Sequence, residues 1–395
     1  MVRPTVARVD LAALKSNYRH IVGHLEADAP DGSAPRVIAV VKANAYGHGA
    51  PQVALALEDA GADVLACADI EEGAALRAAG VRAQILVFGA LSVSDLDGVF
   101  DCHLTPTIST PGAARAVQAA AARHHLRQRY HLKIDTGMNR LGFRHDNLRR
   151  TLPELFASPN LHLEAVYTHF ATADDPESPL FGVQRERFER VLVEIAGIQP
   201  PSTGQPPSPA GPAGDGGWSG DGGWYRHAAN SAALLRDSRV WYDRVRPGLL
   251  LYGLVPPPLA STMPLTPVIT LDSRIVAVKG IRPGEGVGYG VRFTADGPRQ
   301  IAIVPAGYAD GLDLRLAGRG AVLVRGRRVP IVGSICMDML MADVTGLDVS
   351  PGDEVVIIGS QGNDRIDVRE MAAQIGTIPY EILCRIGSRI ERVYQ

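Results

Sequence analysis

The stretch that decides the fold is Arg36-Val-Ile-Ala-Val-Val-Lys-Ala-Asn-Ala-Tyr-Gly-His-Gly49. After its first residue it has an apolar run rich in valine, which is typical of a strand buried on both faces. A lysine follows at once, and a segment with two glycines then leads into helical spacing over 51–60. A strand, a polar turn and a helix in this order indicate one unit of an α/β fold.

The same unit recurs along the first two-thirds of the chain. Further strands are predicted at 64–67, 84–88, 130–135 and 163–168, with helices over 71–79 and 113–123. Continuous apolar strands between helices indicate a parallel sheet with both faces covered. With so many repeats in roughly 250 residues, an eight-fold (β/α) barrel of the TIM type fits better than an open sheet.

The pattern changes from about Thr266. Strands are predicted at 269–278, 300–304, 321–324 and 354–358, separated by Gly/Pro turns with little helix between them. We therefore expect an α/β chain with an N-terminal barrel over 1–262 and a separate all-β domain over 263–395.

Residues 199–223 differ from both parts. Pro, Gly and Ser dominate them, and Gly214-Asp-Gly-Gly-Trp218 recurs as Gly220-Asp-Gly-Gly-Trp224. Such a composition buries too little apolar surface to offset the entropy cost of ordering. We expect a mobile insertion in a surface loop.

Composition excludes several classes of partner. Lys+Arg number 40 and Asp+Glu 42, which gives 40 − 42 = −2, and no long run of one sign is present. A nucleic-acid or membrane-surface partner needs a concentrated basic face, so neither is expected. The four cysteines lie far apart without metal-ligand spacing, as expected for free thiols in a reducing compartment; they are Cys67, Cys102, Cys336 and Cys384. With no signal peptide or membrane span predicted, we expect a cytoplasmic protein that acts on a small molecule without a metal.

Lys42 is the first candidate catalytic residue. It directly follows a predicted barrel strand, and the carboxyl ends of such strands form the catalytic face. Partial desolvation there favours a neutral amine, which can bond to an aldehyde cofactor. Considered alone, a lysine that ends a strand in water is the more frequent case.

Short motifs follow one another along the whole chain. Besides 41–49 they include His131-Leu-Lys-Ile-Asp-Thr-Gly-Met-Asn-Arg-Leu-Gly142, 167–174, 227–232, 246–253, 286–290, 306–311, 335–338 and 378–381. In this order they resemble the alanine racemases, a family of fold-type III pyridoxal-phosphate enzymes. The resemblance runs from about residue 5 to the C-terminus and implies a pyridoxal 5'-phosphate cofactor. It implies an isomerase that interconverts L- and D-alanine and supplies D-alanine for cell-wall peptidoglycan.

The resemblance also implies a pair of bases. Lys42 would hold the cofactor, and Lys42 and Tyr289 would move protons on opposite faces of the substrate. Tyr289 would reach the active site of the partner subunit, which implies a homodimer with shared sites. Without Lys42 and the other motifs, Tyr289 between two glycines would be explained equally well as a packed turn residue.

Arg246 is implied to face the pyridine nitrogen of the cofactor. An arginine keeps its proton in a protein and can only donate, so the ring nitrogen would stay unprotonated. This favours racemisation over transamination, whereas decarboxylating relatives place an acidic residue there. His227 would orient Arg246, and His169 would lie against the cofactor ring; a strand-end arginine or a core histidine is the structural alternative.

The remaining implied roles concern anionic groups and access. Phosphate contacts would come from Tyr46, Ser231, Gly248, Leu249 and Tyr380. The substrate carboxylate would meet Arg140 and the backbone of Met337. Lys133 matches a position that is carbamylated in many members, and Tyr308 and Asp338 would narrow the entrance to a methyl-sized side chain. Ser334 stands where many members have arginine, which puts the local charge in doubt.

Three other functions stay open. A broader racemase for serine or other small side chains is the main alternative. A decarboxylase of the same fold is disfavoured by Arg246 and by the narrow entrance. A non-catalytic protein that binds pyridoxal phosphate is disfavoured by the second domain with Tyr289 and Met337.

Overall fold

The computed structural model describes residues 4–29, 33–91, 96–198 and 223–395. The chain divides into two compact units. We call Ala13–Ala45 with Ala50–Pro267 the barrel unit, and Met1–Ala12, Tyr46–Gly49 and Val268–Gln395 the strand unit. Apart from Gly223, the insertion predicted at 199–223 lies outside the described residues.

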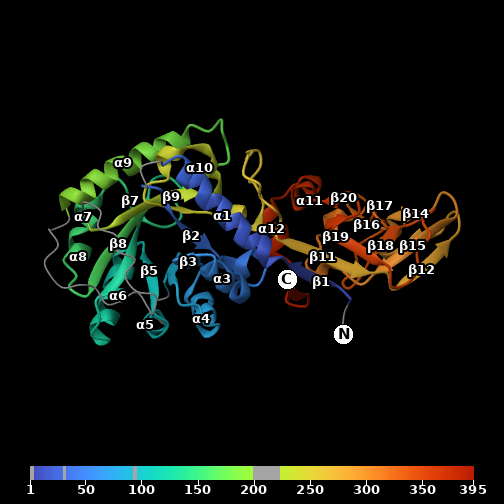
Figure 1. Cartoon of the computed structure of the whole chain (residues 1–395), viewed down its shortest axis with the longest axis horizontal. Helices are drawn as coiled ribbons and strands as arrows, with labels where there is room; N and C mark the ends of the chain where they lie inside the picture. Colours follow the sequence, from blue (N-terminus) through green and yellow to red (C-terminus); the bar gives the residue numbers. More distant parts are fainter. Residues whose placement is uncertain (1–3, 30–32, 92–95, 199–222) are drawn as a thin grey trace. The chain divides into compact units, whose positions relative to one another are not determined.

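Eight parallel strands close the barrel unit into a ring. In Figure 1 this unit is coloured from blue to yellow, with helices beside the strands. In ring order they are β2 (Arg36–Val40), β3 (Val64–Cys67), β4 (Gln84–Val87), β5 (Leu104–Ile108), β6 (Gln128–Asp135), β8 (Leu161–Tyr167), β9 (Tyr225–Asn230) and β10 (Arg244–Arg246). The ring closes where β10 pairs with β2. The predicted eight-fold barrel is confirmed.

Helices alternate with these strands along the chain. They are α1 (Leu11–Ala27), α3 (Ala50–Asp59), α4 (Ile70–Ala78), α5 (Asp97–Asp101), α6 (Pro111–Arg123), α7 (Leu148–Thr151), α8 (Pro153–Phe156), α9 (Leu180–Ile198) and α10 (Ser231–Arg236). In α6 the local signals agree, because the Thr110 hydroxyl accepts from Ala113 N at 3.1 Å and Pro111 opens the helix. Its buried residues recur at helical spacing from Ala114 to Ala121, so one face packs inward.

The strand unit contains a long mixed sheet and two small ones. The long sheet has the order β17 (Arg327–Pro330), β16 (Ala321–Val324), β19 (Glu354–Gln361), β11 (Ile269–Arg274), β1 (Val6–Val9), β21 (Glu391–Tyr394), with β20 (Asp364–Ile366) on β19. One small sheet has the order β12 (Ala277–Ile281), β15 (Arg299–Val304), β18 (Leu340–Asp343). The other consists of β13 (Gly286–Val287) and β14 (Phe293–Thr294). A buried apolar cluster that includes Ile281, Val287 and Met341 holds the small sheets together.

Three details differ from the expected pattern. The single strand expected at 269–278 is two strands, because Ile275 N donates to Asp353 O and Val276 N to Ile303 O, which moves the chain to another sheet. β1 pairs with β11 and β21, so the start of the chain belongs to the strand unit. The strand unit is also not purely β, since α11 (Val368–Ile375) and α12 (Pro379–Cys384) follow β20.

Helix length and polarity bear on membranes. None of the helices in the described part of the chain combines the length and the apolar character that a membrane span requires.

Candidate active site

Lys42 follows β2 at the carboxyl end of the barrel and opens a left-handed turn. Ala43, Asn44 and Ala45 all have φ near +53°, and Ala45 N donates to Val41 O at 2.9 Å. Residues other than glycine pay roughly 1 kcal/mol each for this conformation, so tertiary contacts must hold it. The turn therefore presents Lys42 on a backbone that the surrounding structure fixes.

Glu72 in α4 supplies part of that support. Its carboxylate accepts from Asn44 N at 3.3 Å and from Ala68 N at 2.8 Å. The Asn44 side chain in turn accepts from Ala50 N at 2.8 Å. Glu72 was not among the predicted site residues, because its contact with the Lys42 turn is to the backbone of Asn44, 28 positions earlier in the chain.

Cations surround Lys42 in the barrel unit. Burial, and then the nearby charges of Arg140, Arg246 and Lys42, lower the pKa of Lys133 to about 8. Lys133 is buried in β6, whereas Arg140 is exposed in the loop that follows. Four cations with this mutual influence make the region electropositive, which suits an anionic ligand.

Gly142 sets the path of the loop that contains Arg140. Its φ is +130°, and a Cβ there would lie 2.6 Å from the backbone nitrogen of Asp135. The Asp135 carboxylate accepts from Gly137 N at 2.9 Å and from Asn139 N at 3.1 Å. The loop thus folds back tightly on the end of β6, and a side chain at 142 would push it away.

Arg246 ends β10 and is only 3% exposed. Its Nη1 donates to His227 Nδ1 at 2.7 Å, and its Nη2 lies 2.9 Å from the carbonyl oxygens of Thr168 and Ala228. His169 Nδ1 lies 3.2 Å from Nη2. Burial lowers the pKa of Arg246 to about 10, which still leaves a cation at neutral pH.

The histidines beside Arg246 are acceptors. Burial, and then the charge of Arg246, lowers the pKa of both His169 and His227, so both rings are neutral. Within the described part of the chain, the acceptors around Arg246 contact only its two terminal nitrogens, Nη1 and Nη2. The Nε–H group is therefore available to a ligand. An acceptor such as a pyridine nitrogen fits that donor.

Ser231 joins two neighbouring strand ends. It follows β9, and its hydroxyl oxygen accepts from Gly248 N at 2.9 Å. Leu250 N lies 3.5 Å from the same oxygen, within the 3-10 turn Leu249–Tyr252. A hydroxyl beside backbone N–H groups at the barrel mouth is the chemistry that a phosphate needs.

Tyr289 lies in the strand unit on a short turn between two glycines. Gly288 and Gly290 have φ of +72° and +70°, and the phenol side chain is 78% exposed. The Ser334 hydroxyl donates to Tyr289 O at 2.7 Å. Ser334 therefore ties down this turn, although it contributes no charge.

Tyr308 and Met337 are brought together in the strand unit by a close backbone approach. A Cβ at Gly307 would lie 2.3 Å from Met337 O, and Ala309 N donates to that oxygen at 3.0 Å. Both side chains are exposed, and Asp338 forms an ion pair with Arg389 at 2.6 Å.

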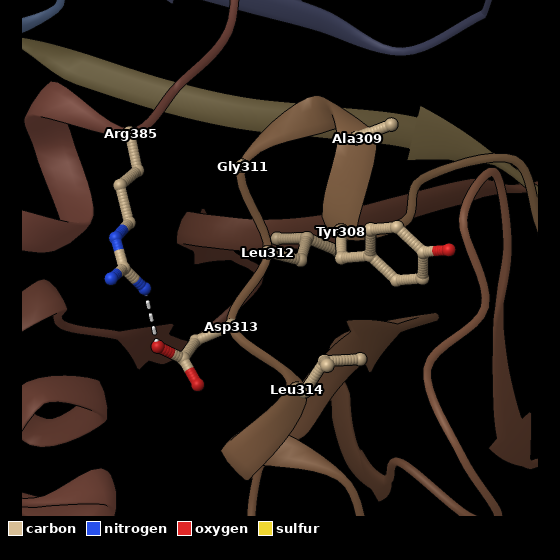
Figure 2. Close-up of a pocket in the computed structure, with 7 residues that line it drawn as sticks. All are labelled: Tyr308, Ala309, Gly311, Leu312, Asp313, Leu314 and Arg385. Atoms are coloured by element: carbon tan, nitrogen blue, oxygen red, sulfur yellow. Dashed lines mark hydrogen bonds and ion pairs between the residues drawn. The ribbon is translucent and has the colours of Figure 1, made fainter.

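A hollow of about 420 Å³ lies beside Tyr308 (Figure 2). Arg385 donates to Asp313 at 2.6 Å on one side of it, and the ring of Tyr308 points away from this pair. In the same unit, the rings of Tyr46 and Tyr380 lie 5.9 Å apart between centroids.

The predicted residues thus fall into two groups. The barrel unit has Lys42, Lys133, Arg140, His169, His227, Ser231, Arg246, Gly248 and Leu249, and the strand unit has Tyr46, Tyr289, Tyr308, Met337, Asp338 and Tyr380. The described residues contain no group of three or more His, Cys, Asp or Glu that could bind a metal ion.

Lys42 is half-buried at a strand end of a parallel barrel and lies among cations and neutral histidines. Such a site is typical of a barrel enzyme that acts on an anionic small molecule. Residues 9–206 match the family model of the alanine racemase N-terminal domain, and 268–394 match that of the C-terminal domain. The chain therefore belongs to the alanine racemase family.

Individual relatives cover the chain from end to end. Alanine racemases of Symbiobacterium thermophilum and Carboxydothermus hydrogenoformans are each 40% identical over 100% of this chain, which covers 97% and 100% of theirs. The structure of the Streptomyces lavendulae alanine racemase is similar with a TM-score of 0.87 at 32% identity, covering 100% of this chain and 98% of that one. The Bacillus anthracis enzyme with bound L-Ala-P has a TM-score of 0.85 at 34% identity, with coverage of 100% and 96%.

Proposed function

We propose that this protein is an alanine racemase that interconverts L- and D-alanine with pyridoxal 5'-phosphate. The observation that carries the proposal is Arg246, a buried cation held among neutral acceptors in the same cationic region as Lys42. Membership of the alanine racemase family supports it. Supply of D-alanine for peptidoglycan follows from that activity.

The barrel unit has groups that fit each part of the cofactor. Lys42 would bond to its aldehyde, Arg246 would donate to its ring nitrogen, and His169 would contact its ring. Ser231 and the backbone of Gly248 and Leu249 would hold its phosphate. The resemblance to the family also assigns Tyr46 and Tyr380 to phosphate binding. When bound, pyridoxal phosphate withdraws electrons from the Cα–H bond of an attached amino acid.

Arg246 decides which reaction follows when the cofactor withdraws electrons from the Cα–H bond. Because it stays protonated, it can only donate to the ring nitrogen, which remains without a proton of its own. An unprotonated ring would draw less charge away from Cα, which would favour return of the proton to that carbon. Arg246 thereby favours racemisation over transamination.

Two residues move the α-proton. Lys42 takes it from D-alanine, and Tyr289 takes it from L-alanine on the opposite face. Arg140 and the backbone of Met337 hold the carboxylate, while Tyr308 and Asp338 limit the side chain to a methyl group. The 78% exposure of Tyr289 within one chain supports a homodimer in which this phenol completes the partner's site.

A racemisation assay tests the proposal. L-alanine incubated with the cofactor-loaded protein should lose optical rotation until both isomers are equal, and serine and a basic amino acid should react more slowly. The same protein without cofactor is the control. Faster racemisation of serine would favour the broader enzyme, and no change with any amino acid would disprove the proposal.

A cytoplasmic location stays a prediction from the four free cysteines.

Lys133 should react with carbon dioxide. A pKa near 8 leaves part of the amine neutral at mildly alkaline pH, and only a neutral amine forms a carbamate. The product is an anion that can hold Arg140. In ¹³C-bicarbonate we expect a carbamate resonance that grows from about pH 7 to about pH 9. Lys133→Met should lack it and Lys279→Met, at an exposed site, should retain it; a signal that persists in Lys133→Met would assign it elsewhere.

A further inference from the structure

A continuous line of hydrogen bonds crosses the interior of the barrel unit behind Arg246. Arg246 Nη1 meets His227 Nδ1 at 2.7 Å, and His227 Nε2 meets His131 Nδ1 at 3.1 Å. His131 Nε2 then meets a carboxylate oxygen of Glu164 at 3.2 Å. Both histidines are fully buried, and the Glu164 side chain is 11% exposed. The line runs from the end of β10 to residues near the middle of β6 and β8.

The two ends of this line fix the direction of every hydrogen bond. Arginine has no acceptor, so His227 Nδ1 must accept and the His227 proton must be on Nε2. His131 Nδ1 must then accept, which places the His131 proton on Nε2. That proton faces Glu164, and a carboxylate only accepts. A reversed or doubly protonated histidine would set two N–H groups against each other.

The surroundings stabilise this arrangement. Burial opposes the charge on Glu164, but the hydrogen bond from His131, the Arg129 cation and Gln84 outweigh it and lower its pKa to about 2. Arg129 contacts Oε1 at 3.2 Å, while Gln84 donates to Oε2 at 2.6 Å. Burial lowers the pKa of His131 and of His227, so both rings stay neutral. The Tyr225 oxygen, 2.9 Å from His131 Nε2, can share the same proton.

We propose that Glu164 is a positioning residue for Arg246, acting through His131 and His227 by fixing the tautomer of both rings. The role of Glu164 extends the proposed function. Only the expected effect on kcat rests on that function, whereas the tautomers of the two histidines do not. With a carboxylate at position 164, His227 always presents a bare Nδ1 to Arg246. The guanidinium is then held in one orientation for the ring nitrogen of the cofactor.

Nitrogen NMR of the ¹⁵N-histidine-labelled holoenzyme tests the tautomers directly. We expect both rings to be protonated on Nε2 alone, with signals assigned by their loss in His131→Gln and His227→Gln. A proton on Nδ1 of either ring in the unmodified protein would overturn the proposal. This measurement needs no variant at 164 and no turnover, so a protein with these tautomers but no racemase activity would disprove only the proposed function.

Glu164→Gln tests the effect on Arg246. An amide has a single acceptor oxygen, whereas donors face both carboxylate oxygens, Arg129 on one and His131 with Gln84 on the other. Wherever the NH₂ group turns toward His131, the tautomers of both histidines reverse, so we expect a mixture. We expect kcat to fall roughly tenfold, with a smaller change in KM. Arg129→Lys, which keeps the carboxylate, should retain the tautomers. Unchanged His227 signals and kcat in Glu164→Gln would contradict the positioning role.

Discussion

Lys42→Ala should remove the visible absorbance band of the lysine-bound cofactor and lower racemisation roughly 10,000-fold. The lysine supplies both the amine that bonds to the aldehyde and the base on one face, so a methyl group replaces neither function. Half-burial at the end of β2 makes the change tolerable for folding. Borohydride reduction followed by peptide mapping would locate the cofactor on the peptide that contains Lys42.

Lys133 is the matched control because it lies near the same charges. Lys133→Met should still trap the cofactor on Lys42 after reduction. If Lys42→Ala retained the absorbance band and racemised alanine, another lysine would hold the cofactor. The proposed role of Lys42 would then be wrong.

The barrel could be predicted because its signal is local. The barrel strands identified from the sequence are short segments, most of them mainly apolar like Val64–Cys67, and the structure reproduces their bounds within two residues. The place of Val6–Val9 could not be predicted this way, since its partners Ile269–Arg274 and Glu391–Tyr394 are more than 250 residues away. Pairing at that distance leaves no periodicity in a short segment.

The helices of the strand unit did have a local signal. In Val368–Ile375 the buried residues Val368, Met371, Ala372 and Ile375 follow helical spacing. Asp367 caps the start, and Gly376 ends the helix in the left-handed conformation. The flanking strands outweighed these signals in the expectation of an all-β domain.

The site divides in the same way. The residues with predicted roles were found through motifs, whereas His131 and Glu164 act through buried contacts between different strands. One signal for His131 was present, because it precedes Lys133 by two positions in a strand and must share its face. Nothing local marks Glu164, whose partners come from β4 and β6.

Tyr289→Phe should suppress racemisation by roughly 100- to 10,000-fold. The exposed ring keeps its shape, so the loss reflects the missing hydroxyl. Solvent hydrogen exchange at Cα should fall further for L-alanine than for D-alanine, because Lys42 still serves the other face. Tyr242→Phe is the control, since its buried hydroxyl has no recorded hydrogen-bond partner within the described ranges. Equal losses for both isomers would contradict the assignment of faces.

Mixed dimers decide which chain supplies the phenol. If Tyr289 serves the partner's site, a dimer of one Lys42→Ala chain and one Tyr289→Phe chain has one intact site, made of Lys42 from the second and Tyr289 from the first. Random exchange makes half of the dimers mixed, so two nearly inactive preparations should recover roughly a quarter of the normal activity. If each chain supplies its own phenol, no site is intact and mixing restores nothing. Sedimentation of the mixture shows that dimers are present, which separates that result from a failure to assemble.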